Sequence, residues 1–256
     1  MNRIKELFAR KQRDILNIYF TAGYPQLADT EPIILSLAEA GADLIEVGMP
    51  YSDPLADGPT IQESGSQAIA NGMTLEVLFK QLARVRPQTD IPLILMGYFN
   101  QLMQYGVERF LDDCVRVGVD GLILPDLPLY EYETTYQKAI ESRGLCVSFL
   151  ITPQTQAERI RKVDELSSGF IYMVSSAAIT GGKGGITDEQ IDYFQRVNAM
   201  KLRNPRLIGF GISNHESFRT ACQYAAGAII GSAFIRALGT AGDVRKLCHT
   251  FVQGIR

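Results

Sequence analysis

Short apolar segments alternate along this chain with segments of helical periodicity, and this alternation constrains the fold more than any other feature of the sequence. Eight apolar segments are predicted as strands: residues 15–20, 44–47, 93–96, 121–124, 147–151, 170–174, 207–210 and 228–230. Most of them are continuously apolar, which is typical of strands buried on both faces and therefore of a parallel sheet.

Helices are predicted between and after these strands, at residues 31–40, 75–85, 108–117, 133–143, 157–166, 188–201, 215–224 and 243–255. Dividing 256 residues among eight repeats gives 32 residues each, about the length of one strand, one helix and two short loops. The sequence therefore predicts an α/β fold, a single (β/α)8 TIM barrel whose one domain spans residues 1–256. The alternative is a doubly wound open sheet, which would normally carry a GxGxxG turn that this chain lacks.

Three further segments modify this plan. Residues 1–14 carry Ile4, Leu7 and Phe8 at helical spacing without the apolar core of a secretory signal, which predicts an extra N-terminal helix. The long intervals 48–92 and 175–206 predict elaborated loops after strands 2 and 6, on the face where such barrels carry their active sites.

Charge and cysteine content exclude several classes of protein. The 25 basic and 28 acidic side chains give a net charge of −3, too balanced for a nucleic-acid groove or a basic membrane face. The longest apolar stretch has 12 residues, short of the roughly 20 that span a bilayer. Four scattered cysteines without a CxxC pair fit neither a zinc site nor a disulfide framework, so we expect a cytoplasmic protein with a small-molecule or protein partner.

A carboxylate interrupts the second apolar strand. A buried Glu46 costs several kcal/mol unless it is neutral or paired, and such a site raises its pKa toward the range useful for acid–base chemistry. Asp57 follows 11 residues later on a loop rich in proline and glycine, close enough to face the same pocket. The alternatives are a structural Glu46 bonded to backbone and an Asp57 that only caps a loop.

Other catalytic groups are scarce. His215 falls at the start of a helix and His249 in the last helix, and neither cysteine clusters nor HExxH spacing indicate a metal. None of the eight lysines falls in a predicted strand, so a Schiff-base lysine in the barrel is not expected. Carboxylates must then do the chemistry, and cleavage of a carbon–carbon bond would need an electron sink within the substrate.

Glycine turns end the last two predicted strands, at residues 209–213 and 230–233. Backbone N–H groups in such turns approach an anion closely, and Ser232 would begin a short helix, so a phosphate site is predicted there. Glycines that merely end two strands are the alternative. The loop 181–185 contains four glycines, which suits either a lid or a flexible connector, and Tyr172 is either a pocket wall or barrel core.

Several segments of the chain resemble the tryptophan synthase alpha chain family. The most specific is residues 45–59, IEVGMPYSDPLADGP, and the resemblance continues through 20–25, 96–100, 117–121 and both glycine turns, over essentially the whole chain. The family is a (β/α)8 barrel that splits indole-3-glycerol phosphate into indole and glyceraldehyde 3-phosphate. It implies a partner, a pyridoxal-phosphate-containing beta chain in an alpha2-beta2 tetramer, and no cofactor or metal in this chain.

The resemblance also implies roles for single residues. Glu46 matches the catalytic acid/base and Asp57 the second catalytic carboxylate, with Thr180 as the lid residue that meets Asp57. Positions that match the indole pocket and the phosphate site are Tyr19, Met96, Ile123, Tyr172 and Phe210 for the first, and Gly181, Gly211, Gly231 and Ser232 for the second. Pro50 and Asp53 match the loop that faces the beta chain.

This family's mechanism would supply the missing electron sink, because an indole protonated at C3 by Glu46 becomes a cation that accepts the electrons of a retro-aldol cleavage. A lid richer in glycine than is usual in the family is a departure that bears on lid ordering. Two other functions stay open at this level: another phosphate-binding barrel enzyme, and a binder of the substrate or the beta chain without chemistry.

Overall fold

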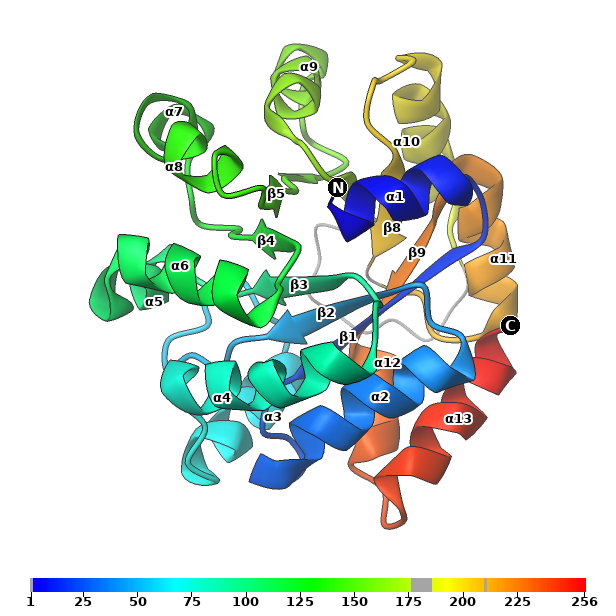
Figure 1. Cartoon of the computed structure of the whole chain (residues 1–256). Coiled ribbons are helices and arrows are strands. Elements are labelled where there is room, and N and C mark those ends of the chain that lie inside the picture. Colours follow the sequence, from blue (N-terminus) through cyan, green and yellow to red (C-terminus); the bar gives the residue numbers. More distant parts are fainter. Residues whose placement is uncertain (1, 176–185, 210) are drawn as a thin grey trace.

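The computed structural model describes residues 2–175, 186–209 and 211–256, which form one nine-stranded sheet with helices around it (Figure 1). The strands are β1 Ile15–Thr21, β2 Leu44–Gly48, β3 Leu93–Met96, β4 Gly121–Ile123, β5 Cys146–Val147, β6 Leu150–Ile151, β7 Ile171–Val174, β8 Arg206–Gly209 and β9 Gly227–Ile230. Their order is β5-β4-β3-β2-β1-β9-β8-β7-β6, and each of the pairings is parallel, as predicted.

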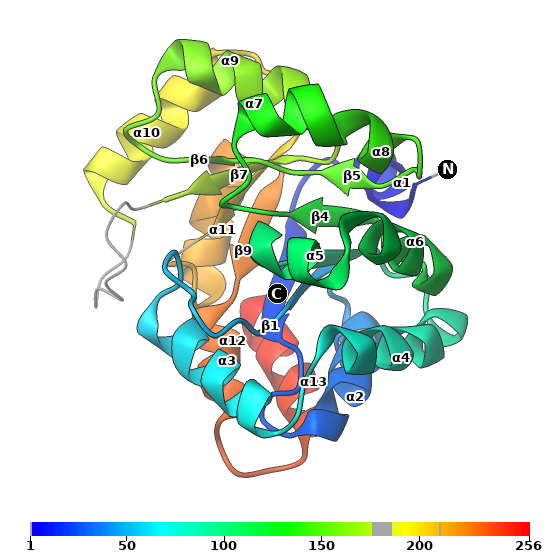
Figure 2. The same ribbon diagram turned by 90° about the vertical axis from the view of Figure 1, so that its left-hand side faces the viewer.

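The fifth predicted strand closes the barrel. It divides into β5, which pairs with β4, and β6, which pairs with β7, so residues 146–151 join the two ends of the sheet (Figure 2). Backbone hydrogen bonds continue through the break, from Ser148 N to the Leu122 oxygen at 3.1 Å and from Tyr172 N to the Phe149 oxygen at 2.9 Å. The break lets one segment bend between two neighbours, a geometry that strand periodicity alone could not reveal.

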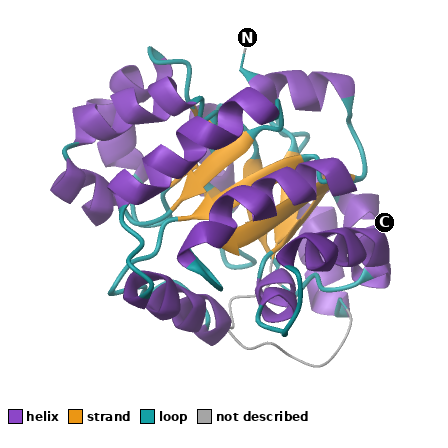
Figure 3. Cartoon of the chain, turned by 60° about the horizontal axis from the view of Figure 1, so that its bottom comes forward, coloured by secondary structure: helices purple, strands orange, loops and turns teal. Residues whose placement is uncertain are grey.

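The helices lie around the strands, which occupy the middle of the molecule (Figure 3). They are α1 Arg3–Arg10, α2 Thr30–Ala40, α3 Pro59–Ala70, α4 Leu75–Val85, α5 Phe99–Tyr105, α6 Val107–Val117, α7 Leu129–Glu131, α8 Gln137–Glu141, α9 Ala157–Leu166, α10 Asp188–Ala199, α11 His215–Tyr224, α12 Ser232–Leu238 and α13 Val244–Ile255. None of the helices in the described part of the chain has the length and apolarity of a membrane span.

Three helices and one irregularity went unpredicted. The predicted helix 133–143 begins with a π-helical turn, Tyr132–Tyr136, and α3, α5 and α7 lie in stretches where no helix was predicted. The buried face of α3 consists of Ser64, Gly65 and Ala68, so it lacks the apolar periodicity that marks a helix in the sequence. Pro59 at its first position starts the helix.

Side chains on the two faces of the sheet form two clusters. Leu16, Ile18 and Phe20 of β1 face the helices, whereas Ile15 and Tyr19 face the barrel interior. The interior cluster also contains Ile4 and Leu7 of α1, so the predicted N-terminal helix covers one end of the barrel.

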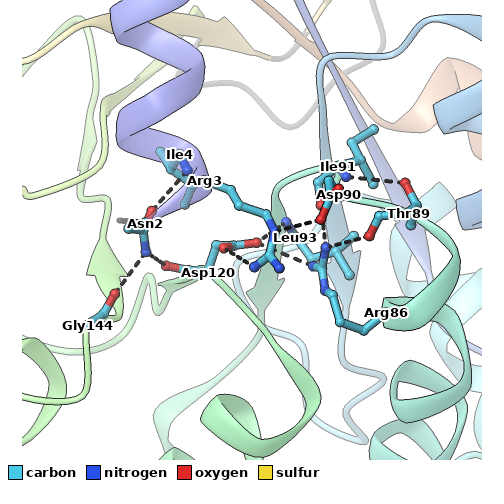
Figure 4. A network of polar contacts seen from close by, with 10 residues as sticks. All are labelled: Asn2, Arg3, Ile4, Arg86, Thr89, Asp90, Ile91, Leu93, Asp120 and Gly144. Carbon is cyan, nitrogen blue, oxygen red and sulfur yellow. Dashed lines mark hydrogen bonds and ion pairs between the residues drawn. The ribbon is translucent and has the colours of Figure 1, made fainter.

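Polar contacts fix α1 at that end (Figure 4). Asn2 caps the helix by accepting from Ile4 N, and its Nδ2 donates to the backbone oxygens of Asp120 and Gly144 at 2.6 and 2.8 Å. The Arg3 guanidinium lies 3.1 Å from the Asp120 carboxylate. Since Asp120 directly precedes β4, this end is the one where the strands begin, and the opposite end is left for a site.

Candidate active site

Glu46 lies at the third position of β2 and points into the barrel. Leu44 on the same face belongs to the interior cluster, whereas Ile45 and Val47 face the helices, as the alternation of a strand requires. The Glu46 side chain is fully buried, and Asn17 Nδ2 donates a hydrogen bond of 2.5 Å to its Oε1. Its other oxygen, Oε2, has no hydrogen-bond partner among the described residues.

Burial controls the protonation of Glu46. Desolvation disfavours the charged form and raises the pKa of the carboxyl to about 8, against the opposing effect of the Asn17 hydrogen bond. At neutral pH the group is therefore protonated, and its unpartnered oxygen can carry a proton to a substrate.

Asp57 lies on the loop between β2 and α3, where the surrounding structure holds it. The Tyr98 hydroxyl donates to its Oδ2 at 3.2 Å and accepts from Ala56 N at 2.9 Å, and Gln62 Nε2 donates to its backbone oxygen at 2.8 Å. Burial raises the pKa of Asp57 to about 6, and the Tyr98 hydrogen bond opposes the rise. Asp57 is thus ionised at neutral pH while Glu46 is protonated, which is the separation that acid–base pairs need.

The predicted pocket walls on the strands come together around Glu46. Tyr19, Met96, Ile123 and Tyr172 all belong to or pack against the interior cluster. A Cβ on Gly48 would overlap the hydroxyl of Tyr19, and one on Gly209 would overlap that of Tyr172, so these two glycines leave the room for both phenol rings. Burial raises the pKa of Tyr19 and Tyr172, and both stay neutral hydroxyls.

The predicted phosphate turns flank the same region. Gly231 directly precedes α12, which begins at Ser232, and a Cβ at Gly231 would lie 3.2 Å from Cδ1 of Tyr19. Gly211 has φ +79°, a conformation that favours glycine. Thr180, Gly181 and Phe210 lie outside the described residues.

The histidines and the described lysines, which the sequence does not predict to be catalytic, lie outside the strands of the barrel. His215 Nδ1 is 2.9 Å from the backbone oxygen of Ile255, and His249 Nε2 is 3.7 Å from Glu39, so both histidines belong to the outer helices. The described lysines are in helices or loops. Within the described residues, His, Cys, Asp and Glu form no group of three that could hold a metal ion.

Three side chains of the site were missed by the sequence analysis: Asn17, Tyr51 and Tyr98. Tyr51 stacks on Tyr98 with ring centroids 5.0 Å apart; Tyr51 lines the same small cavity as Asp57, and Tyr98 is hydrogen-bonded to Asp57. Asn17 stands two residues before Tyr19 in an apolar strand, so strand alternation already places it on the interior face. A polar residue on that face was the available signal.

Comparison with known proteins shows which family the chain resembles. The family model for the tryptophan synthase alpha chain matches residues 6–253. Alpha chains of Flavobacterium psychrophilum and Flavobacterium johnsoniae are 56% and 55% identical, over 93% of this chain and 94% of the first, and over 100% of both chains for the second.

Solved structures agree with these sequence matches. The tryptophan synthase complex of Pyrococcus furiosus contains a chain that superposes with a TM-score of 0.87 at 32% identity, covering 96% of this chain and 98% of that one. The alpha subunit of Legionella pneumophila gives a TM-score of 0.89 at 30% identity, covering 100% and 97%. Because the family model and these relatives match nearly the whole chain, the chain belongs to the tryptophan synthase alpha chain family.

Proposed function

We propose that Glu46 and Asp57 together carry out the reaction of this family, the cleavage of indole-3-glycerol phosphate to indole and glyceraldehyde 3-phosphate. The observation that carries this assignment is a fully buried, protonated Glu46 and an ionised Asp57 that both act on the same two interior tyrosines, Tyr19 and Tyr172. The enzyme is then a carbon–carbon lyase that works by acid–base chemistry.

The reaction begins with protonation. Glu46 delivers its proton to C3 of the indole ring, and the Asp57 carboxylate accepts a hydrogen bond from the ring N–H, which stabilises the resulting cation. The Glu46 carboxylate then takes the proton from the hydroxyl on the carbon attached to C3. The carbon–carbon bond breaks, its electrons return to the ring as indole, and the hydroxyl carbon becomes the aldehyde of glyceraldehyde 3-phosphate.

Binding is assigned to the surfaces on either side of the carboxyl pair. Tyr19, Met96, Ile123 and Tyr172, with Phe210, wall the indole ring. Gly181, Gly211, Gly231 and Ser232 hold the phosphate, and Thr180 meets Asp57 from the lid. The position of Gly231 against Tyr19 supports one continuous pocket for both halves of the substrate.

A beta chain is the proposed partner, in an alpha2-beta2 tetramer, and indole passes to it. Pro50 and Asp53 are the interface residues: they lie on the loop that also presents Leu55, whose side chain is 89% exposed. Pyridoxal phosphate belongs to the beta chain, and this chain uses no cofactor or metal, because proton transfer between carboxyls and substrate completes its reaction.

Residues 1–256 form one domain in this proposal, since strands from Ile15 to Ile230 share one sheet. A cytoplasmic location fits four cysteines that are all free thiols.

Indole release from indole-3-glycerol phosphate, by the chain alone and with a beta chain, tests the assignment. Glu46→Gln should lower kcat by about 10²–10⁴-fold, because it removes the proton donor without changing the shape of the side chain. Binding of indole-propyl phosphate, an unreactive analogue, should persist in the variant.

Three outcomes separate the alternatives. Near-normal turnover by Glu46→Gln would overturn the role of Glu46. Failure of the wild-type chain to bind the analogue would favour another phosphate-barrel reaction. Binding of the analogue with no indole release in either condition would favour a binder without chemistry.

A further inference from the structure

Asn17 is a buried polar residue on a strand face that points into the barrel. It lies on β1 between Ile15 and Tyr19, which both face the interior, and its strand neighbours are Leu44 of β2 and Ile229 of β9. Its side chain is fully buried. An amide among such apolar groups is costly unless its polar atoms are bonded.

Of the two polar atoms of the Asn17 side-chain amide, one has a hydrogen-bond partner among the described residues. Asn17 Nδ2 donates to Glu46 Oε1 at 2.5 Å, whereas Oδ1 has no hydrogen-bond partner in the described part of the chain. A residue retained for stability would be expected to bond both ends of its amide. The one bond it does make ends on the carboxyl assigned to proton transfer.

We propose that Asn17 is the positioning residue of Glu46, which holds Oε1 as an acceptor and leaves Oε2 to carry the proton to the substrate. This inference rests on the proposed function of Glu46. When Glu46 gives up its proton, the negative charge that develops on the carboxylate is met by a donor already in place, so no reorganisation is needed during the reaction.

The side-chain hydrogen bond that acts on the pKa of Glu46 comes from Asn17, and the other groups around Glu46 act differently. Tyr19 of β1 and Tyr172 of β7 are the titratable groups that interact with Glu46, Asp57 of the following loop acts on the same two tyrosines, and β3 contributes the apolar Ile94. The two tyrosines are neutral and Asp57 is negative. Asn17 is the group whose hydrogen bond lowers the pKa of Glu46 against its burial.

Asn17→Leu is the test, because leucine keeps the branched shape and removes the donor. We expect kcat for indole release to fall about tenfold with KM within about twofold, since positioning acts on the chemical step and not on substrate binding. The alkaline limb of the kcat profile, set by loss of the Glu46 proton, should move from about 8 to higher pH by about one unit.

Asn71→Leu is the matched control. Asn71 Nδ2 donates to the backbone oxygens of Gly23 and Pro25 at 2.9 Å, so this variant also loses hydrogen bonds of a partly buried amide, but none to Glu46. Its alkaline limb should stay in place. If Asn17→Leu does not fold, Asn17→Val offers a smaller side chain that suits a strand.

The titration of Glu46 by ¹³C NMR, in wild type and Asn17→Leu, gives a second readout that does not require activity. A raised pKa in the variant supports the proposal, and an unchanged pKa with unchanged kcat overturns it. If the wild-type chain released no indole, the proposed function would fail, while this titration would still decide whether Asn17 tunes Glu46.

Discussion

Each end of the barrel buries a carboxyl group, and the two groups have different hydrogen-bond and ion-pair partners. At the end covered by α1, Asp120 is 3% exposed and is met by two cations: Arg3 at 3.1 Å and Arg86 at 3.3 Å. Leu93 N donates to it as well, at 2.9 Å (Figure 4). Toward the other end, Glu46 is also buried, but its partner is the neutral amide of Asn17.

Both carboxyl groups are buried, so the difference in their partners accounts for the difference in their roles. Two cations and a backbone donor pair with the Asp120 carboxyl, so it joins α1, β3 and β4. Glu46 has a single uncharged donor, so its neutral form is favoured and one oxygen stays available. The same chemical group thus serves as a structural joint at one end and as an acid at the other.

The largest expected effect that sharpens this comparison is the pH dependence of stability caused by Glu46. Its pKa is about 8 in the folded chain and near 4.5 when unfolded, so the unfolded state releases the proton first as pH rises. Stability is therefore fully present below about pH 4.5 and is lost up to about pH 8, by on the order of 4 kcal/mol between pH 5 and pH 9.

Urea unfolding across that pH range measures this loss, with Glu46→Gln as the control that cannot ionise. The free energy of unfolding of the variant should fall less steeply with pH than that of the wild type. Parallel curves would mean that Glu46 is paired in solution and is no different from Asp120.

Asp120→Ala tests the other end. The change leaves Arg86 partly buried without its counterion and Leu93 N without its acceptor, so the free energy of unfolding should fall by about 3 kcal/mol. Turnover by the folded fraction should stay within about twofold, as measured by indole release at low temperature. Asp112→Ala, which removes an exposed partner of Arg143, should cost less than about 1 kcal/mol. A large loss of kcat in Asp120→Ala would break the division between the two ends.

Tyr98→Phe has the smallest expected effect. It removes the donor to Asp57 Oδ2, whose hydrogen bond lowers the pKa of that carboxyl, so the acid limb of the kcat profile should move upward from about 6. Activity at pH 6 should then fall about threefold, with little change at pH 8. Tyr51→Phe removes a neighbouring hydroxyl that accepts from Asn100 and should leave the acid limb where it is. Equal shifts in both variants would mean that the loop, and not the Tyr98 hydrogen bond, sets the pKa of Asp57.

Strands and most helices were predictable from the sequence because strong periodicity reflects burial directly. Glu46 stood out because a carboxylate within an apolar strand is unusual on physical grounds alone. The helix α3 was missed because Ser64, Gly65 and Ala68 form its buried face, and the split of the fifth strand was missed because its cause is closure against β4 and β7. Asn17 was overlooked although alternation places it on the interior face, because its partner lies on another strand.

The sequence by itself determined the alternation of strands and helices, the parallel sheet and the presence of Glu46 and Asp57, since these depend on local pattern and residue type. The tertiary structure decided that residues 146–151 close the barrel, that Tyr98 holds Asp57 and that Asn17 holds Glu46. The tertiary structure also sets the protonation of Glu46 and Asp57. The pKa of a carboxyl depends on the water it loses and the donors it meets, and both come from residues distant in the chain.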